Sequence, residues 1–248
     1  MVQLSNREIK EIKSLSSKKF RDETGLFVVE GEKMVREALE SSFEVVGVYR
    51  RDEIGDEAMS RISLLSSPSP VLAVVRRPAG LDSCPSEIGD GLYLALDSIR
   101  DPGNLGTIIR IADWFGIKSV IASPDTVELL NPKVVQSTMG AIFRVDFHYA
   151  DLQAFARTVL DKGGKVYGTF LDGRDIYGCD LDTGAGSPAV IVIGNEANGI
   201  SDGMASLVSD RLFIPPYPVD DPGSESLNAA VATAVTVAEF RRRAHTSK

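Results

Sequence analysis

The residues best suited to chemistry surround a glycine-rich loop at positions 194–199. An apolar run, Val190–Ile193, precedes the loop and predicts a buried strand that ends at Gly194. The loop glycines let backbone amides approach a bound molecule closely. Glu196 lies between them, so we expect its carboxylate at the mouth of a sheet, where α/β proteins bind ligands. This stretch therefore predicts a ligand-binding loop.

A second polar group opens a helix nearer the middle of the chain. Asp101–Asn104 contains Pro and Gly and predicts a turn, with Asn104 as the helix cap. Apolar residues then recur every three or four positions, which predicts a helix over about 105–115 with one buried face. Arg110 falls off that face and is expected to project over the edge of the sheet. By itself, Arg110 would better fit a surface ion pair with Asp113.

A third polar group, Ser226-Leu227-Asn228, follows a strand that ends at Ile214. It opens a predicted helix over 226–242, which carries a narrow stripe of small residues: Ala230, Val231, Ala234, Val235 and Ala238. Small side chains allow close helix packing, either inside the fold or across a dimer. The loop before this helix, PYPVDDPGSE, is long and rich in proline.

Together the three stretches resemble motifs 1, 2 and 3 of the SpoU/TrmH family of knotted RNA 2′-O-methyltransferases, part of the SPOUT superfamily. The segment NLGTIIRIA fits N-x-x-G-x-x-R-x-A, the 194–199 loop fits G-x-E-x-x-G, and Ile214-Pro215 with Ser226–Asn228 fits I-P…S-L-N. Pro216 departs from the family pattern, which usually has methionine there. The resemblance covers residues 92–240.

The resemblance implies S-adenosylmethionine (SAM) as the cofactor and a ribose 2′-hydroxyl of structured RNA, above all 23S-type ribosomal RNA, as the methyl acceptor. It implies catalytic roles for Arg110, Asn104, Glu196, Ser226 and Asn228. It implies cofactor contacts for Thr169, Phe170, Gly194, Ile214 and Leu227. Because a guanidinium stays protonated at neutral pH, we expect Arg110 to stabilise the developing alkoxide and to bind the neighbouring phosphate. The resemblance further implies a trefoil knot, a homodimer and no metal, with Arg110 acting in its own subunit or across the dimer.

Composition excludes several other classes of protein. The chain is 43% hydrophobic and 25% charged, as in ordinary globular proteins. It has neither an apolar run long enough for a membrane helix nor a signal-peptide core, so we expect a cytoplasmic protein. Two histidines and two cysteines without metal-like spacing leave little material for a histidine triad or a zinc site. The net charge of −8 argues against a nucleic-acid partner, although residues 1–21 carry six basic and two acidic side chains.

The pattern of the chain predicts two α/β domains. Strands are predicted at 26–30, 43–49, 71–75, 91–97, 119–122, 144–147, 165–170, 189–193 and 211–214. Helices are predicted at 6–15, 32–40, 53–62, 105–115, 132–139, 151–161, 203–208 and 226–242. In the second part, strands that alternate with helices indicate a parallel sheet covered on both faces. The Pro-, Gly- and Ser-rich stretch 78–90 indicates a linker, so we expect domains at 1–85 and 90–248.

The N-terminal part resembles the small, ribosomal-protein-like α/β RNA-binding domain that precedes the catalytic domain in the rRNA-type branch of the family. The match rests on Lys18, Lys19, Arg21 and Glu30-Gly31 and covers about residues 5–40. We expect the three basic residues to contact RNA and to make its binding salt-dependent. A basic run of this kind also fits a solvated helix face.

Three alternatives remain open at this point. A tRNA 2′-O-methyltransferase is the nearest, although the separate N-terminal domain argues against the minimal tRNA-type form. A catalytically silent RNA-binding factor in ribosome assembly is the second, and the presence of Arg110 speaks against it. A Rossmann-type nucleotide enzyme would need G-x-G-x-x-G after the first strand of the second domain, and the DPGNLG turn lacks that spacing.

Overall fold

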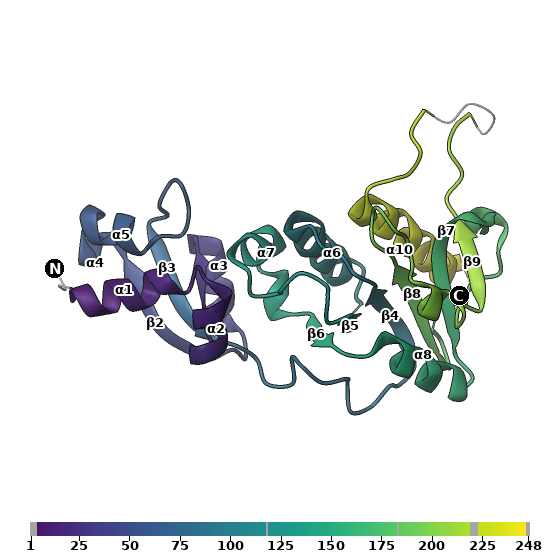
Figure 1. The fold of residues 1–248 in the computed structure, drawn as a ribbon, viewed down its shortest axis with the longest axis horizontal. Helices are drawn as coiled ribbons and strands as arrows, with labels where there is room; N and C mark the ends of the chain where they lie inside the picture. The colour runs from purple at the N-terminus through teal and green to yellow at the C-terminus, as the bar shows by residue number, and fades with distance from the viewer. Residues whose placement is uncertain (1–3, 118, 183, 219–222, 247–248) are drawn as a thin grey trace. The chain divides into compact units, whose positions relative to one another are not determined.

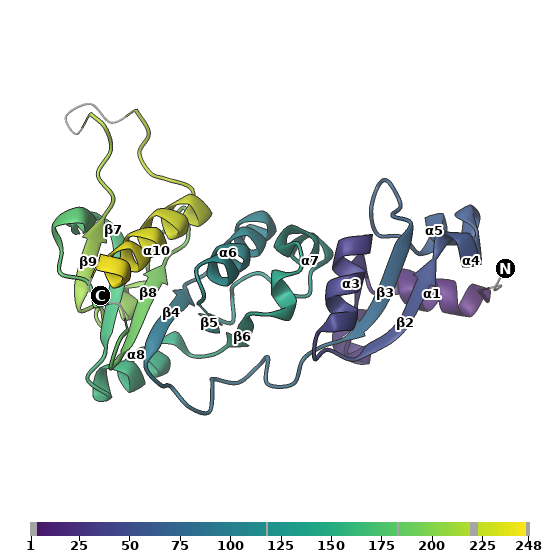
Figure 2. The same cartoon turned by 180° about the vertical axis from the view of Figure 1, so that it is seen from behind.

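The structure is a computed structural model that describes residues 4–117, 119–182, 184–218 and 223–246 (Figures 1 and 2). Its contacts form two compact units. Unit 1 contains Met1–Ala79 with Glu128–Arg144, and unit 2 contains Gly80–Val127 with Val145–Lys248. The chain first changes unit inside the predicted 78–90 linker. Residues 128–144, which the sequence pattern places in the second domain, pack with unit 1 instead.

Unit 1 is a three-stranded antiparallel sheet with helices around it. The strands are β1 (Leu26–Glu30), β2 (Val45–Arg50) and β3 (Val71–Arg76), in the order β1-β3-β2. The helices are α1 (Asn6–Ser14), α2 (Lys18–Thr24), α3 (Glu32–Glu40), α4 (Arg51–Ile54), α5 (Asp56–Ile62) and α7 (Pro132–Thr138), with a 3₁₀ turn at Ala141–Phe143. A buried cluster from α1, α5 and the sheet forms one core of this unit, with Met59, Ile62 and Leu72 fully buried.

The first two helices have defined ends. Ser5 caps α1: its hydroxyl accepts from the Glu8 amide, and the Glu8 carboxylate accepts from the Ser5 amide. The short helix α2 was not predicted, because seven residues are too few for a periodic pattern. It ends at Gly25, whose φ of 65° is a left-handed conformation that favours glycine.

Unit 2 is built on a six-stranded sheet in which every pairing is parallel, as predicted. The strands are β4 (Gly91–Leu96), β5 (Ser119–Ala122), β6 (Asp146–Tyr149), β7 (Lys165–Asp175), β8 (Pro188–Ile193) and β9 (Asp210–Phe213), in the order β6-β5-β4-β8-β7-β9. The helices are α6 (Pro102–Trp114), α8 (Leu152–Asp161), α9 (Asp202–Ala205) and α10 (Ala229–Thr246), with a 3₁₀ turn at Ile176–Gly178.

Helices cover both faces of this sheet. Strand β8 is buried along its whole length, which explains its unbroken apolar sequence. On one face, α8 and α9 pack on a cluster that includes Phe155, Val166 and Val192. On the other face, α6 and α10 lie side by side (Figures 1 and 2), and the ring of Phe240 on α10 packs edge-on against Tyr167. Burial raises the pKa of Tyr167 to about 12.

The helix that carries motif 1 begins earlier than predicted. Asp101 is its N-cap, because the Asp101 carboxylate accepts from the Asn104 amide at 2.8 Å. Pro102 occupies the first turn, where its missing N–H costs nothing. Asn104 therefore lies inside the first turn of α6 rather than at its cap, and its side chain is free to make other contacts. Of the helices in the described part of the chain, none is long and apolar enough to cross a bilayer.

Candidate active site

The parallel sheet of unit 2 brings the predicted motifs to one edge. Leu96 pairs with Ile193, so Asp97 and Gly194 leave β4 and β8 side by side. On the next strand, Gly168 pairs with Val192, which places Thr169 at the same edge, and the Thr169 hydroxyl donates to the Val192 carbonyl at 3.4 Å. The carboxyl ends of parallel strands are where α/β proteins bind ligands.

One side chain from each motif meets at this edge in a hydrogen-bonded chain. The Asn228 amide nitrogen donates to the Asn104 side-chain oxygen at 2.8 Å, and the Asn104 amide nitrogen donates to the Glu196 carboxylate. The Asn228 oxygen accepts from the amides of Ala230 and Val231 in the first turn of α10. Each amide group therefore has a defined orientation. Glu196 and Asn228 are exposed, so the chain of groups faces solvent.

The 194–199 loop is tightly closed. A Cβ added at Gly194 would overlap the backbone of Gly199 and Ile200, so this position requires glycine. Asn195 and Gly199 exchange two backbone hydrogen bonds, and the Asn195 side-chain oxygen accepts from the amides of Ala197 and Asn198. The closure presents Glu196 outward from a fixed turn.

Sequence reasoning missed four residues that support this loop: Asp97, Ser98, Asn195 and Ser201. Asp97 is buried, and its carboxylate accepts from Ser201. The Asn195 amide nitrogen donates to the Ser98 carbonyl at 2.8 Å. The available signal was an acidic residue directly after the apolar run GLYLAL, because a carboxylate at the end of a buried strand needs partners.

Arg110 is exposed and lies on α6 six residues after Asn104, which is about 9 Å along a helix axis. It is not joined to the Asn228–Asn104–Glu196 chain by a hydrogen bond. Within the described residues, no hydrogen bond or ion pair forms at its guanidinium, including the alternative pair with Asp113. A cation that makes no such contact inside its own unit is available for an external anion.

The residues predicted to bind the cofactor lie in different settings. Thr169 and Ile214 are half-buried at the sheet edge, and Ser226 and Leu227 are exposed just before α10. Phe170 is also half-buried, but its ring packs over Gly168, and the Arg211 guanidinium lies 3.5 Å from the ring centroid. Arg211 in turn bonds Asp172 and lowers its pKa. The Phe170 ring is therefore held by protein contacts, which leaves its backbone as the part available to a ligand.

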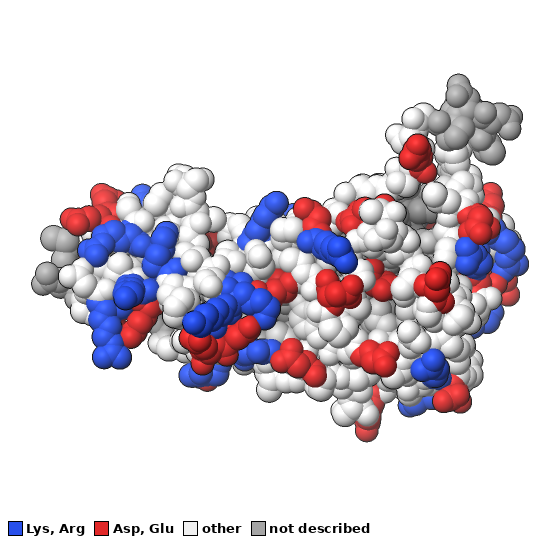
Figure 3. Space-filling view, in the orientation of Figure 1, with Lys and Arg blue, Asp and Glu red and all other residues white. Residues whose placement is uncertain are grey.

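The burial of Arg21 contradicts the prediction that this residue contacts RNA. Its side chain is only 3% exposed and donates to both carboxylate oxygens of Glu128 and to the carbonyls of Leu15 and Ser16. These bonds tie α2 to the 128–144 segment inside unit 1, so Arg21 is a packing residue. Lys18 and Lys19 remain exposed and form i,i+4 pairs with Asp22 and Glu23. Figure 3 shows basic side chains on this face interspersed with acidic ones.

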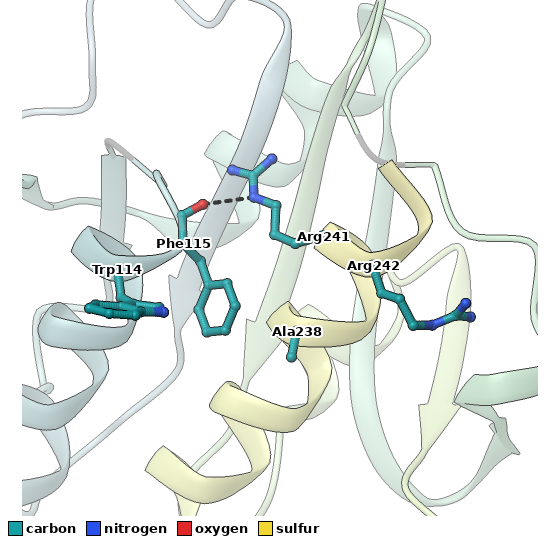
Figure 4. Close-up of a pocket in the computed structure, with 5 residues that line it drawn as sticks. All are labelled: Trp114, Phe115, Ala238, Arg241 and Arg242. Carbon is teal, nitrogen blue, oxygen red and sulfur yellow. Dashed lines mark hydrogen bonds between the residues drawn. The ribbon is translucent and has the colours of Figure 1, made fainter. Parts of the chain in front are cut away.

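The basic end of α10 is engaged by protein groups. Arg241 donates to the carbonyls of Phe115 and Gly116 after α6, while Arg242 and Arg243 both bond Glu239, whose pKa their hydrogen bonds lower to about 2. A pocket of about 380 Å³ lies between the two helices, lined by Trp114, Phe115, Ala238, Arg241 and Arg242 (Figure 4). The indole of Trp114 is 85% exposed. All three arginines therefore contact protein groups.

No group of three or more His, Cys, Asp or Glu side chains with metal-binding geometry occurs among the described residues. The edge of the sheet offers amide dipoles, a carboxylate and glycine-bounded backbone, and α6 of the same unit adds the exposed cation of Arg110. Such groups bind and orient a substrate and stabilise charge that develops on it.

Residues 91–238 match the model of the SpoU rRNA Methylase family, and residues 6–74 match an MRM3-like substrate binding domain. The chain is 29% identical over 251 residues to the 23S rRNA (guanosine(2553)-2′-O)-methyltransferase RlmP of Bacillus subtilis, covering 95% of this chain and 96% of the relative. A TrmH-family structure from Porphyromonas gingivalis is 35% identical with a TM-score of 0.86, covering 98% of this chain and 100% of that one. An AdoMet-bound rRNA methyltransferase from Sinorhizobium meliloti is 29% identical with a TM-score of 0.86, covering 98% of each chain.

Proposed function

Because this chain belongs to the SpoU rRNA methylase family, we propose that it transfers a methyl group from SAM to a ribose 2′-hydroxyl of ribosomal RNA. Family membership confirms the predicted enzyme class and cofactor, and the match to a substrate binding domain over residues 6–74 agrees with the predicted N-terminal domain. The observation that carries the proposal is the Asn228–Asn104–Glu196 chain, because it joins one residue of each predicted motif at one edge of the sheet.

The cofactor site fits the residues at the ends of β8 and β9 and those in the middle of β7, where the pairing of β7 with β8 ends at Gly168. Any side chain at position 194 would overlap the backbone of the loop, and glycine avoids this overlap. Backbone groups near Thr169, Phe170, Ile214 and Leu227 surround the same edge of the sheet. We assign the adenosine part of SAM to these backbone groups. When bound, SAM supplies an electrophilic methyl group on a positively charged sulfur.

Arg110 supplies the fixed positive charge of the reaction. As the ribose oxygen forms its bond to the methyl carbon, the carbon–sulfur bond breaks and the hydroxyl proton leaves to solvent. The guanidinium stays protonated, so Arg110 stabilises the developing alkoxide and binds the adjacent phosphate rather than taking up the proton. Asn104, Glu196, Ser226 and Asn228 orient the ribose or this arginine.

The proposal includes a homodimer. An exposed helix face is normally polar, yet the partly exposed side of α10 carries only Val231, Ala232, Ala234, Val235 and Ala238 before its arginines begin. Trp114 on the neighbouring α6 is the most exposed of the large apolar side chains near this stripe. A second copy packed on these two helices would cover both, and Arg110 would then lie close to the partner. The trefoil knot and the cytoplasmic location are proposed from the family resemblance.

Incubation with tritiated SAM and ribosomal RNA from a strain that lacks the gene tests the reaction directly. We expect label in one 2′-O-methyl nucleoside of the large-subunit RNA. Label in tRNA would instead support the alternative of a tRNA 2′-O-methyltransferase. SAM binding without label in naked RNA, ribosomal subunits or assembly intermediates would favour a silent assembly factor. Light scattering tests the dimer, and Trp114→Glu is expected to shift it toward the monomer, with Tyr177→Glu as an exposed aromatic control in the same unit.

A further inference from the structure

Asp97 holds both ends of the segment that carries Glu196. Its backbone amide donates to the Ile193 carbonyl at 2.9 Å, just before the segment begins. Its carboxylate accepts from the amide and the hydroxyl of Ser201, at 2.8 and 2.7 Å, where the segment ends. A single residue at the end of β4 therefore closes residues 194–201, which include the motif 2 loop, into a loop.

The burial of Asp97 is costly without a cation. Its side chain is 5% exposed, and among the described residues no lysine or arginine forms an ion pair with it. Desolvating a carboxylate is unfavourable unless hydrogen bonds replace water. The two bonds from Ser201 supply that compensation. A neutral side chain would fill the same space without the desolvation cost, so the role of the carboxylate is to bind Ser201.

Ser98, the next residue, is held in an unusual conformation. Its φ of 62° is left-handed, which non-glycine residues rarely adopt. Its amide donates to the Ser123 hydroxyl at 2.9 Å, its hydroxyl donates to Asp125 at 2.5 Å, and its carbonyl accepts from Asn195. Strained residues of this kind persist where several contacts determine them, commonly at functional sites.

The two anchors act on opposite parts of the loop. Asp97 fixes its ends, and Ser98 fixes Asn195, whose side chain folds the turn around Glu196. Glu196 is then placed where Asn104 donates to it. Neither Asp97 nor Ser98 belongs to the catalytic groups assigned above.

We propose that Asp97 and Ser98 are positioning residues that hold loop 194–201 in the shape required for SAM binding and for the Asn104–Glu196 contact. This inference rests on the proposed function for its catalytic readout. It assigns the buried polar groups at the end of β4 to the cofactor loop rather than to the general stability of the fold.

The test compares Asp97→Asn, Ser201→Ala and the double variant with Asp151→Asn. Asp151 is a matched control, because its carboxylate also accepts two hydrogen bonds in unit 2, both from backbone amides at the start of α8. We expect Ser201→Ala to weaken SAM binding about tenfold by calorimetry, and Asp97→Asn to weaken it at least as much. The double variant should bind SAM no more weakly than Asp97→Asn, because both substitutions break the same contact between Asp97 and Ser201. Ser201→Thr keeps the hydroxyl and should restore affinity.

Hydrogen exchange of the 194–201 amides in cofactor-free protein separates this inference from the proposed function. Faster exchange in Asp97→Asn and Ser201→Ala, but not in Asp151→Asn, is the expected result. Unchanged exchange, or a SAM affinity that falls only in proportion to thermal stability as in the control, would overturn the positioning role. If wild-type protein binds no SAM, the proposed function fails, whereas the exchange result still decides the role of Asp97.

Discussion

The two units of this protein differ in charge as much as in topology. Unit 2, which contains the edge of the parallel sheet where the three predicted motifs meet, has 12 basic and 21 acidic residues, a net charge of −9. Unit 1 has 15 basic and 14 acidic residues, a net charge of +1. The overall field of unit 2 therefore repels a polyanion, whereas the field of unit 1 does not. RNA affinity is therefore expected from unit 1, while unit 2 contributes a few localised groups that perform chemistry.

This charge difference between the units explains why the total net charge of −8 does not predict whether the protein binds RNA. The acidic residues of unit 2 include several that bind protein groups, such as Asp97 with Ser201 and Glu239 with two arginines. Arg110 stands apart from them as an exposed cation without a partner in the described residues. Four variants test whether binding and chemistry separate between the units in this way.

The largest effect is expected at Arg110. Arg110→Ala should lower the rate of methylation by about 10²–10³-fold, as loss of a group that stabilises developing negative charge does. SAM affinity should hold, because the guanidinium is assigned to the RNA side of the reaction. Single-turnover kinetics and calorimetry measure the two quantities. Arg157→Ala, an exposed arginine on α8 of the same unit, is the control. Equal loss of rate and SAM affinity would assign Arg110 to the cofactor.

Gly194→Val should weaken SAM binding by about a hundredfold or more. A β-branched side chain at this position would overlap the backbone of Gly199 and Ile200 and force the loop open. RNA binding should change little, since it is expected from unit 1. Gly89→Val is the control, because a Cβ at Gly89 meets no atom within 4 Å. Unchanged calorimetric affinity in Gly194→Val would refute the placement of the cofactor.

Arg21→Met should destabilise unit 1 by about 3 kcal/mol, since it leaves Glu128 with no arginine partner in a largely buried site. SAM affinity, a property of unit 2, should be unaffected. Adding Glu128→Leu should recover part of the lost stability, measured by denaturant unfolding. Recovery would support a packing role. If Arg21→Met instead keeps full stability and binds RNA more weakly, Arg21 contacts RNA and the packing role is wrong.

The smallest effect is expected from the exposed lysines. Lys18→Glu with Lys19→Glu should weaken RNA binding about tenfold and flatten its salt dependence by between one and two units of slope, because each phosphate contact contributes about one. Binding measured over a salt series checks this, with Arg157→Glu in unit 2 as the control. An unaltered slope would make the two lysines a solvated helix face that pairs with Asp22 and Glu23, as the structure shows them.

Local sequence pattern was sufficient for most elements, whereas the membership of the site stays a prediction. Strand β1 and helix α3 begin and end at the predicted residues, because alternation and helical spacing are properties of neighbouring positions. The short helix α2 was missed, and strand β6 begins two residues later than predicted, after a 3₁₀ turn at Ala141–Phe143. In both places the local signal is only a few residues long.

The sequence by itself determined the parallel sheet, the three polar groups at its edge and the family to which they belong, since each depends on residue types at short, fixed spacings. Only the tertiary structure decided which of these groups touch. Asn104 meets Asn228 across 124 positions, Asp97 meets Ser201 across 104, and Arg21 turns inward to Glu128 across 107. Such contacts depend on how strands are ordered in a sheet and on which surfaces become buried, and no local spacing encodes either.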